Sequence, residues 1–182
     1  MDLRRQEITS RRLFLCEQGH SMAKEIERKY LVIGNDWRRL GKPTLYRQGY
    51  LAKTEDCIVR VRLEGEKGKL TIKGWPRGIV RDEFEYEIPA KDVATMLDAI
   101  GKEHQVIKNR TKIPYKGKTW EIDEFFGENE GLIVAEIELK SEDEPFEVPA
   151  WVGRDVSLDP RYYNISLMLH PYKEWTKEEK SH

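Results

Sequence analysis

Hydrophobic and charged positions alternate along most of the chain from residue 24 to residue 140. Successive side chains of a β-strand point to opposite faces, so this period of two predicts strands with one apolar and one charged face. Gly, Pro, Asn and Asp separate the alternating segments and indicate turns. Eight strands are predicted in this way, at residues 24–33, 44–53, 57–65, 68–74, 79–88, 104–114, 118–126 and 131–140.

Helical periodicity is confined to a few short segments. Val93, Met96, Leu97 and Ile100 recur at spacings of three and four, which predicts a helix at 90–101 ending at Gly101. After residue 140 we expect an acidic loop, a short helical turn near 147–153 and a helix near 164–170. The fold class is therefore mainly β (α+β), an antiparallel core with a few covering helices.

The two ends of the chain differ from this core. Residues 1–22 hold two Arg pairs and an apolar stretch too short for a secretory signal. We expect a disordered N-terminal extension there, with Met22 as the natural start. Residues 23–175 form the predicted domain, a length typical of a single domain, and residues 176–182 a solvated tail.

Composition narrows the class of protein. Lys and Arg number 32 and Asp and Glu 33, and this balance argues against general nucleic-acid binding. Five tryptophans argue against a disordered chain, and no apolar run of about 18 residues predicts a membrane span. Two cysteines fit a reducing compartment. We expect a cytoplasmic protein with a small-molecule partner and no membrane, and the sequence leaves a homodimer open.

Charges of one sign share strand faces. Neighbours on one strand face lie about 6.5–7 Å apart, where like charges repel by about 2.4 kcal/mol at an effective dielectric near 20. A sheet with an ordinary wet face is the alternative, but such a face favours mixed signs. The clustering becomes favourable if acidic sets hold a divalent cation and basic sets hold an anion, as in a site for a metal-bound polyphosphate. Eight strands also suffice to close a barrel around one small ligand.

The first strand carries a recognisable motif. Its residues Glu25-Ile26-Glu27-Arg28-Lys29 resemble the ExExK signature of the CYTH superfamily, also called triphosphate tunnel metalloenzymes. The resemblance covers about residues 23–170 and is closest to small bacterial inorganic triphosphatase-like members. It implies an eight-stranded antiparallel closed tunnel with a charged interior. Further matching sets are Gln48–Tyr50, Arg60–Arg62, Leu70–Lys73, Glu85–Glu87, Arg110–Lys112, Glu121–Asp123 and Glu136–Glu138.

The resemblance also implies roles for these side chains. Carboxylates suit hard cations such as Mg²⁺ or Mn²⁺, and Arg and Lys suit phosphate oxygens. The implied metal ligands are Glu25, Glu27, Glu121, Asp123, Glu136 and Glu138. The implied phosphate-binding residues are Lys29, Arg60, Arg62, Lys73, Arg110 and Lys112. Lys29 is expected to act in catalysis, and Glu85 and Glu87 to orient basic residues or assist the attacking water. Arg81 and Glu83 are expected at the surface.

Three functions remain open at this point. The compact chain and the lack of an obvious nucleoside platform favour metal-dependent hydrolysis of inorganic tripolyphosphate. The alternatives are a class IV-type adenylyl cyclase acting on ATP and a non-enzymatic polyphosphate or nucleotide binder. Release of orthophosphate, formation of cyclic AMP, or binding without turnover would distinguish the three.

Overall fold

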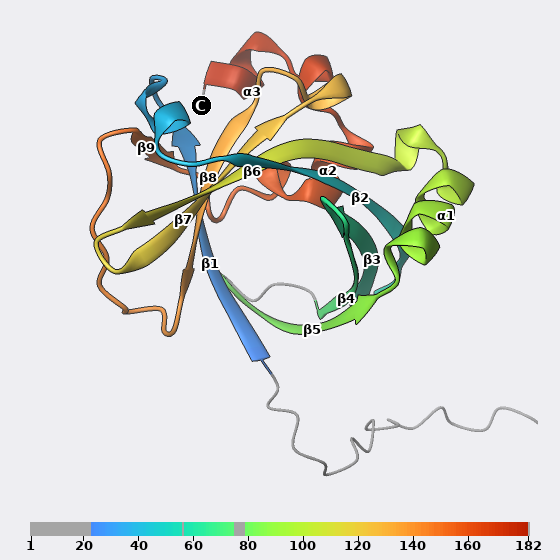
Figure 1. Cartoon of the computed structure of the whole chain (residues 1–182). Helices are drawn as coiled ribbons and strands as arrows, with labels where there is room; N and C mark the ends of the chain where they lie inside the picture. Colours follow the sequence, from blue (N-terminus) through green and yellow to red (C-terminus); the bar gives the residue numbers. More distant parts are fainter. Residues whose placement is uncertain (1–22, 56, 75–78, 182) are drawn as a thin grey trace, which may run out of the picture.

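The computed structural model describes residues 23–55, 57–74 and 79–181 (Figure 1). The expected extension at residues 1–22 lies outside the described residues. Within them, nine strands form one antiparallel sheet in the order β5-β4-β3-β2-β6-β7-β8-β1-β9. The strands are β1 (Ala23–Val32), β2 (Pro43–Lys53), β3 (Cys57–Glu64), β4 (Lys67–Gly74), β5 (Val80–Ile88), β6 (Gln105–Tyr115), β7 (Lys118–Phe125), β8 (Ile133–Leu139) and β9 (Val152–Asp155).

The eight predicted strands are confirmed, with ends that differ by one or two residues. The predicted helices correspond to α1 (Ala90–Ile100) and α2 (Asn164–Leu169). The helical turn expected near 147–153 is wrong, because Val152–Asp155 form the ninth strand, β9, along the edge of β1. Four residues are too few to show the alternation of apolar and polar positions that identifies a strand. Strand β9 forms because the edge of β1 supplies backbone hydrogen-bond partners. The expected tail holds a short helix, α3 (Lys177–Ser181), with no buried residue.

The sheet curves until its two ends meet. Ala23–Ile26 of β1 pair with Val80–Glu83 of β5, which joins strands one to eight into a ring around a central space (Figure 1). This pairing spans four residues, and further along β1 the same edge is taken by β9. The predicted tunnel architecture is therefore present, with the ring completed over only part of its length.

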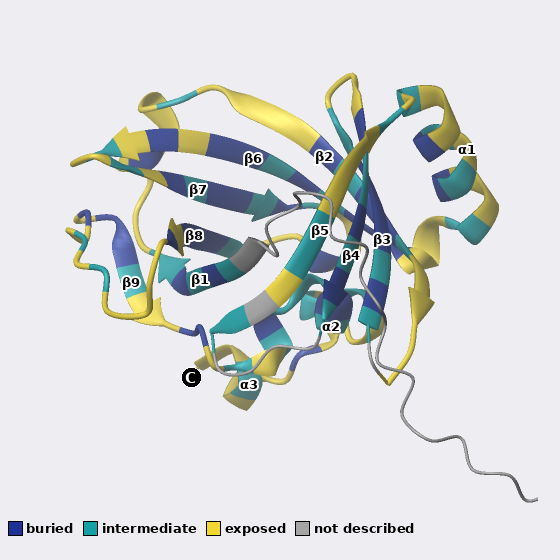
Figure 2. Ribbon diagram, turned by 90° about the horizontal axis from the view of Figure 1, so that it is seen from below, coloured by how far each residue is buried: buried dark blue, intermediate teal, exposed yellow. Residues whose placement is uncertain are grey.

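The apolar strand faces point outward and are covered from outside. Val93 and Leu97 of α1 pack on Val61 of β3, on the outer side of the β3–β4 wall (Figure 2). On the opposite wall, Trp120 packs against Tyr30 and Trp151. A third cluster includes Val106, Tyr162, Leu167 and Trp175, and it fixes the C-terminal segment against the sheet. Because these faces are buried outside, the charged faces must turn inward.

Candidate active site

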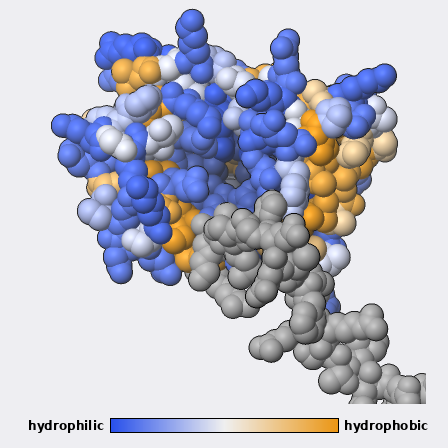
Figure 3. Space-filling view, turned by 60° about the horizontal axis from the view of Figure 1, so that its bottom comes forward, coloured by the Kyte–Doolittle hydropathy of each residue, from blue (hydrophilic) through white to orange (hydrophobic). Residues whose placement is uncertain are grey.

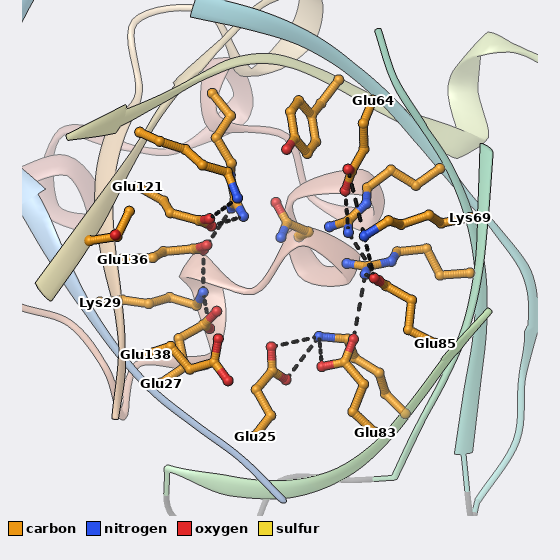
Figure 4. A pocket seen from close by; sticks show the side chains of 18 of the residues that line it. Glu25, Glu27, Lys29, Glu64, Lys69, Glu83, Glu85, Glu121, Glu136 and Glu138 are labelled. Atoms are coloured by element: carbon orange, nitrogen blue, oxygen red, sulfur yellow. Dashed lines mark hydrogen bonds and ion pairs between the residues drawn. The ribbon is translucent and has the colours of Figure 1, made fainter. Parts of the chain in front are cut away.

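The ring of strands encloses a charged cavity of about 870 Å³. Figure 3 shows a hollow whose visible wall is hydrophilic, and Figure 4 shows the side chains that converge in it. Eight glutamates and nine lysines or arginines line it. They are Glu25, Glu27, Glu64, Glu83, Glu85, Glu121, Glu136 and Glu138, and Lys29, Arg60, Arg62, Lys69, Lys73, Arg110, Lys112, Lys118 and Lys140. Tyr46, Thr119, Leu139 and Asn164 complete the lining.

The acidic side of the cavity comes from β1 and β8. Their register places Glu27 opposite Glu138 and Lys29 opposite Glu136. Like charges directly across two strands destabilise a sheet. Burial, followed by the charges of Glu25, Glu121 and Glu27, raises the pKa of Glu138. Repulsion among these carboxylates is thus built into the wall by the pairing of β1 with β8.

Lys29 bridges this acidic set. It is 4% exposed, and its ammonium forms ion pairs with Glu27 and Glu136. Burial raises the pKa of Glu136, but the charges of Lys29, Arg110 and Lys108 outweigh it and hold that pKa well below its usual range. Glu136 is therefore a fixed anion that holds Lys29 and Arg110 in place.

Arg110 reaches the cavity from β6 and is held by carboxylates. Its Nε lies 2.6 Å from Asp123 Oδ1 and its Nη2 2.5 Å from Asp123 Oδ2, and it also contacts Glu121 and Glu136. Although burial opposes it, the charges of Asp123 and Glu136 raise the pKa of Arg110 well above its usual value. The guanidinium is therefore permanently charged, and three carboxylates orient it in this structure.

Asp123 occupies a different position from the one expected of a metal ligand. It is fully buried, it is not among the lining residues, and it forms ion pairs with Arg110 and Lys108. Burial, with the charge of Arg110, lowers the pKa of Lys108 to about 8. Glu121 shares its strand face with Asp123 and does line the cavity. The two residues differ because they sit at different depths along β7.

The basic side of the cavity comes from β3 and β4. Arg60, Arg62 and Lys73 are each less than 9% exposed. Lys73 Nζ lies 2.9 Å from Glu25 Oε2 and 3.0 Å from Glu83 Oε2, so it joins β4 to both β1 and β5. Burial and the neighbouring charge of Arg62 lower the pKa of Arg60. The cations of this wall stand close together, and Glu64, Glu83 and Glu85 balance part of their charge.

The glutamates of β5 differ from expectation at two positions. Glu83 was expected at the surface, but it lines the cavity beside Lys73, because the β1–β5 pairing folds this end of β5 into the wall. Glu87 was expected to take part in catalysis, but it is exposed and is not among the lining residues. It lies next to the last residue of β5, two positions after Glu85. The structure does not describe the side chain of Arg81.

Glu85 lines the cavity and contacts several polar groups. It lies 3.0 Å from Arg62, 2.5 Å from Lys69 and 3.2 Å from the hydroxyl of Thr71. Burial raises its pKa, but the hydrogen bond from Lys69 and the charge of Arg62 outweigh it, so the pKa is lowered. A carboxylate held in this way is a weak base, and its contacts tie it to Arg62 and Lys69.

Tyr46 is a lining residue that the sequence pattern did not single out. Its ring is 4% exposed, and the guanidinium carbons of Arg62 and Arg110 each lie 5.4 Å from its centroid. A cation near an aromatic face is attracted by the ring quadrupole. Because β2 runs between β3 and β6, Tyr46 holds two arginines from opposite neighbours. The signal available in the sequence was its shared strand face with Gln48 and Tyr50.

The expected site residues therefore largely converge. The expected residues found in the lining are Glu25, Glu27, Lys29, Arg60, Arg62, Lys73, Glu85, Arg110, Lys112, Glu121, Glu136 and Glu138. Those not expected are Glu64, Lys69, Glu83, Lys118, Thr119, Leu139, Lys140, Asn164 and Tyr46. Lys112 lies at the rim, with a side chain that is 59% exposed.

No helix in the described part of the chain is long and apolar enough to cross a membrane.

Comparison with known proteins gives consistent results. The CYTH domain family matches residues 23–166. An inorganic triphosphatase of Acetivibrio thermocellus is 48% identical over 154 residues, which cover 85% of this chain and 99% of that protein. One from Nitrosomonas europaea is 35% identical over 149 residues, 80% of this chain and 97% of that protein. A crystal structure of an inorganic triphosphatase superposes with a TM-score of 0.57 at 33% identity, covering 80% of this chain and 97% of that one.

Proposed function

This chain belongs to the CYTH domain family, and we propose that it is a metal-dependent triphosphatase whose substrate is inorganic tripolyphosphate, bound in the charged cavity. The observation that carries the proposal is the lining itself, with eight glutamates beside nine basic residues. Such a lining is nearly neutral overall, and its cations and carboxylates are paired with one another across the cavity. It suits a polyanion that enters together with divalent cations, rather than an anion alone.

The phosphate chain is proposed to lie along the buried cations. Arg60, Arg62 and Lys73 offer donors from one wall, and Lys29 and Arg110 from the other. Arg binds phosphate oxygens with two parallel N–H groups, whereas Lys acts as a point charge. Their present carboxylate partners, such as Glu25 for Lys73, would be exchanged for phosphate oxygens. Lys112 lies at the exposed rim and would meet the substrate at the entrance.

A divalent cation is implied by the family, and the carboxylates fit one. Among the described residues no group of three or more metal-ligating side chains is already assembled, since Lys and Arg pair with Glu25, Glu27, Glu121 and Glu136. The side chain of Glu138 has no ion pair or hydrogen bond within the described chain, and burial followed by the charges of other glutamates raises its pKa. We propose that Glu25, Glu27 and Glu138, with Glu121 and Glu136, hold Mg²⁺ or Mn²⁺. Such an ion neutralises phosphate charge and orients water.

The reaction proposed is an in-line displacement at the terminal phosphorus. A water oxygen forms the new P–O bond, the bond to the bridging oxygen breaks, and the water's proton passes to solvent. Orthophosphate and diphosphate leave. Positioning and charge neutralisation account for most catalysis of this kind. Lys29, Arg62 and Arg110 would stabilise the charge on the phosphoryl oxygens, and Glu85 would hold Arg62 in its orientation.

A panel of substrates tests the proposal. Purified protein is given tripolyphosphate, ATP, GTP or thiamine triphosphate with Mg²⁺ or Mn²⁺, and orthophosphate and cyclic AMP are measured. We expect the highest kcat/KM for tripolyphosphate and no cyclic AMP. A higher value for ATP would contradict the substrate assignment, and cyclic AMP as the main product would favour a cyclase. Binding without turnover would contradict catalysis altogether.

A matched pair of variants tests the site. Glu27→Gln removes a charged oxygen from the cavity with little change in volume. Glu66→Gln makes the same change in the exposed turn between β3 and β4. We expect Glu27→Gln to abolish turnover and Glu66→Gln to retain it, with circular dichroism showing folded protein in both cases. Equal activity of the two variants would defeat the assignment of Glu27.

A further inference from the structure

The strand that pairs with the outer edge of β1 changes from β5 to β9 around Lys29, the residue whose ammonium bridges Glu27 and Glu136. Residues Ala23–Ile26 pair with β5, whereas Tyr30 and Val32 pair with β9. Glu27 N–H still donates to Ile79 O at 3.2 Å. Among the described residues, neither β5 nor β9 lies in register opposite Lys29. The backbone of Lys29 therefore falls in a gap between two sheet partners.

A short segment after β9 occupies this gap. Lys29 N–H donates to Ser157 Oγ at 2.9 Å, and Val156 N–H donates to Lys29 O at 2.8 Å. Ser157 is 6% exposed. Its hydroxyl donates to Asp155 Oδ1 at 2.5 Å, and its own N–H donates to the same oxygen at 2.8 Å. Lys29 O lies 3.3 Å from the same Oγ, and the shorter contact assigns the hydroxyl proton to Asp155, so a lone pair of Oγ faces the N–H of Lys29. We call this arrangement the Asp155–Ser157 clasp.

The clasp acts from outside the substrate cavity. Neither Asp155 nor Ser157 lines that cavity; both line a separate one of about 610 Å³. Lys29 reaches the inner cavity and pairs with Glu27 and Glu136. Ser157 is therefore placed to act on the reaction through the position of β1 at Lys29.

We propose that Ser157, oriented by Asp155, is a positioning residue. It fixes the backbone of Lys29 at the point where the strand beside β1 changes from β5 to β9, and it thereby determines the position of the Lys29 ammonium. This inference rests on the proposed function for its catalytic consequence. A reacting group displaced by about 1 Å can cost on the order of a hundredfold in rate. Loss of the hydroxyl should therefore lower kcat more than it weakens substrate binding, because the other cations still hold the phosphate chain.

A pair of variants of the same shape isolates the hydroxyl. Ser157→Thr keeps it and Ser157→Val lacks it, and Ser157→Ala removes it without adding bulk in case the Val variant fails to fold. With tripolyphosphate and Mg²⁺ we expect kcat to fall at least tenfold in the Val and Ala variants, with KM changed less than threefold. The Thr variant should stay within threefold of the wild type in both constants.

A loss of stability can by itself lower kcat, so a control variant must lose stability at a site away from the clasp. Gln105 is a buried side chain whose amide donates to Leu97 O and Gly101 O, both at 2.7 Å, on the outside of the ring. Gln105→Ala should lower the Tm and leave kcat within twofold. If it lowers kcat as much as Ser157→Ala at a similar Tm, the positioning role is overturned.

Amide hydrogen exchange measures the clasp without reference to activity. In nuclear magnetic resonance experiments the Lys29 amide should exchange at least tenfold faster in the Val and Ala variants than in the wild type and the Thr variant. Unchanged exchange, or unchanged kcat in both hydroxyl-free variants, would overturn the inference. If the wild type does not hydrolyse tripolyphosphate, the proposed function fails. The exchange rates alone then test whether the Asp155–Ser157 clasp holds the backbone of Lys29.

Discussion

At the scale of single residues, the site is a set of charges that share their partners. Lys73 is shared between Glu25 and Glu83, and Lys29 between Glu27 and Glu136. Glu138 is the exception, since within the described chain no cation forms an ion pair with it. Each carboxylate therefore has a different electrostatic role, although all belong to similar same-sign strand faces.

Glu138 should destabilise the metal-free protein at neutral pH. Burial and the charges of Glu25, Glu121 and Glu27 raise its pKa in the folded state. Ionisation thus costs more in the folded than in the unfolded chain, and stability falls as pH rises through the interval between the two pKa values. Glu138→Gln should raise the Tm in EDTA by about 2 °C at pH 7 and by much less at pH 4. Thermal melts at the two pH values check this; an equal effect at both would contradict it.

Tyr46 should matter through its ring rather than its hydroxyl. Arg62 and Arg110 both lie against that ring. Tyr46→Phe keeps the aromatic face and should leave kcat/KM for tripolyphosphate within about threefold, whereas Tyr46→Leu should lower it by about tenfold, near 1.4 kcal/mol. Steady-state kinetics of the two variants provide the measurement. Equal values would show that the ring does not position the arginines.

At the scale of elements, the outer cover sets the shape of the wall. Helix α1 starts directly against β4, where an added Cβ at Gly68 would come within 2.5 Å of Ile88 O and 2.9 Å of Ala90 Cα. Both of these neighbours are backbone atoms, so a side chain cannot be accommodated by a rotamer change. The close approach of β4 to the end of β5 therefore requires glycine at this position.

Two glycines of the same strand provide a matched comparison. Gly68→Ala should lower the free energy of unfolding by about 1–3 kcal/mol, as overpacking typically does. At Gly74, the other end of β4, the nearest atoms to an added Cβ lie at 3.8 Å, which is ordinary contact. Gly74→Ala should therefore change stability by less than about 0.5 kcal/mol. Urea unfolding of the two variants measures both values, and similar losses would refute the packing explanation.

At the scale of the whole molecule, the architecture is inverted relative to most small domains. The ring turns its charged faces inward, and the apolar faces are buried under α1, the segment around Trp151 and the C-terminal helices. Arg60, Lys73 and Glu136 are all less than 9% exposed. Buried charges are tolerated when paired, and here Lys73 and Glu136 each form ion pairs with two oppositely charged residues.

This charge balance predicts that substrate and metal bind cooperatively. A phosphate chain that takes Lys73 and Arg110 would leave Glu25 and Glu121 without their cations, and a divalent ion would restore the balance. Imidotriphosphate, which resists hydrolysis, and Mg²⁺ together should raise the Tm by more than the sum of their separate effects. Thermal melts with each ligand alone are the controls. An additive or smaller effect would show that the two sites are independent.

The sequence by itself determined the strands, their two faces and the clustering of charge. Alternation is a local property, so eight strands and α1 could be predicted within one or two residues of their ends. The motif Glu25-Ile26-Glu27-Arg28-Lys29 and its later companions identified most of the charged lining for the same reason. Residues that share a strand face must point in the same direction, whatever the strand pairs with.

The tertiary structure decided how deep each residue lies and which residues are its neighbours. A period of two gives direction but not depth, so Asp123 could not be separated from Glu121, or Glu87 from Glu85. Glu83 entered the wall only because β5 pairs with β1, across more than fifty residues of chain. Strand β9 and the clasp at Ser157 likewise depend on the free edge of β1. These positions are set by strand pairing between distant segments, and no local pattern carries that information.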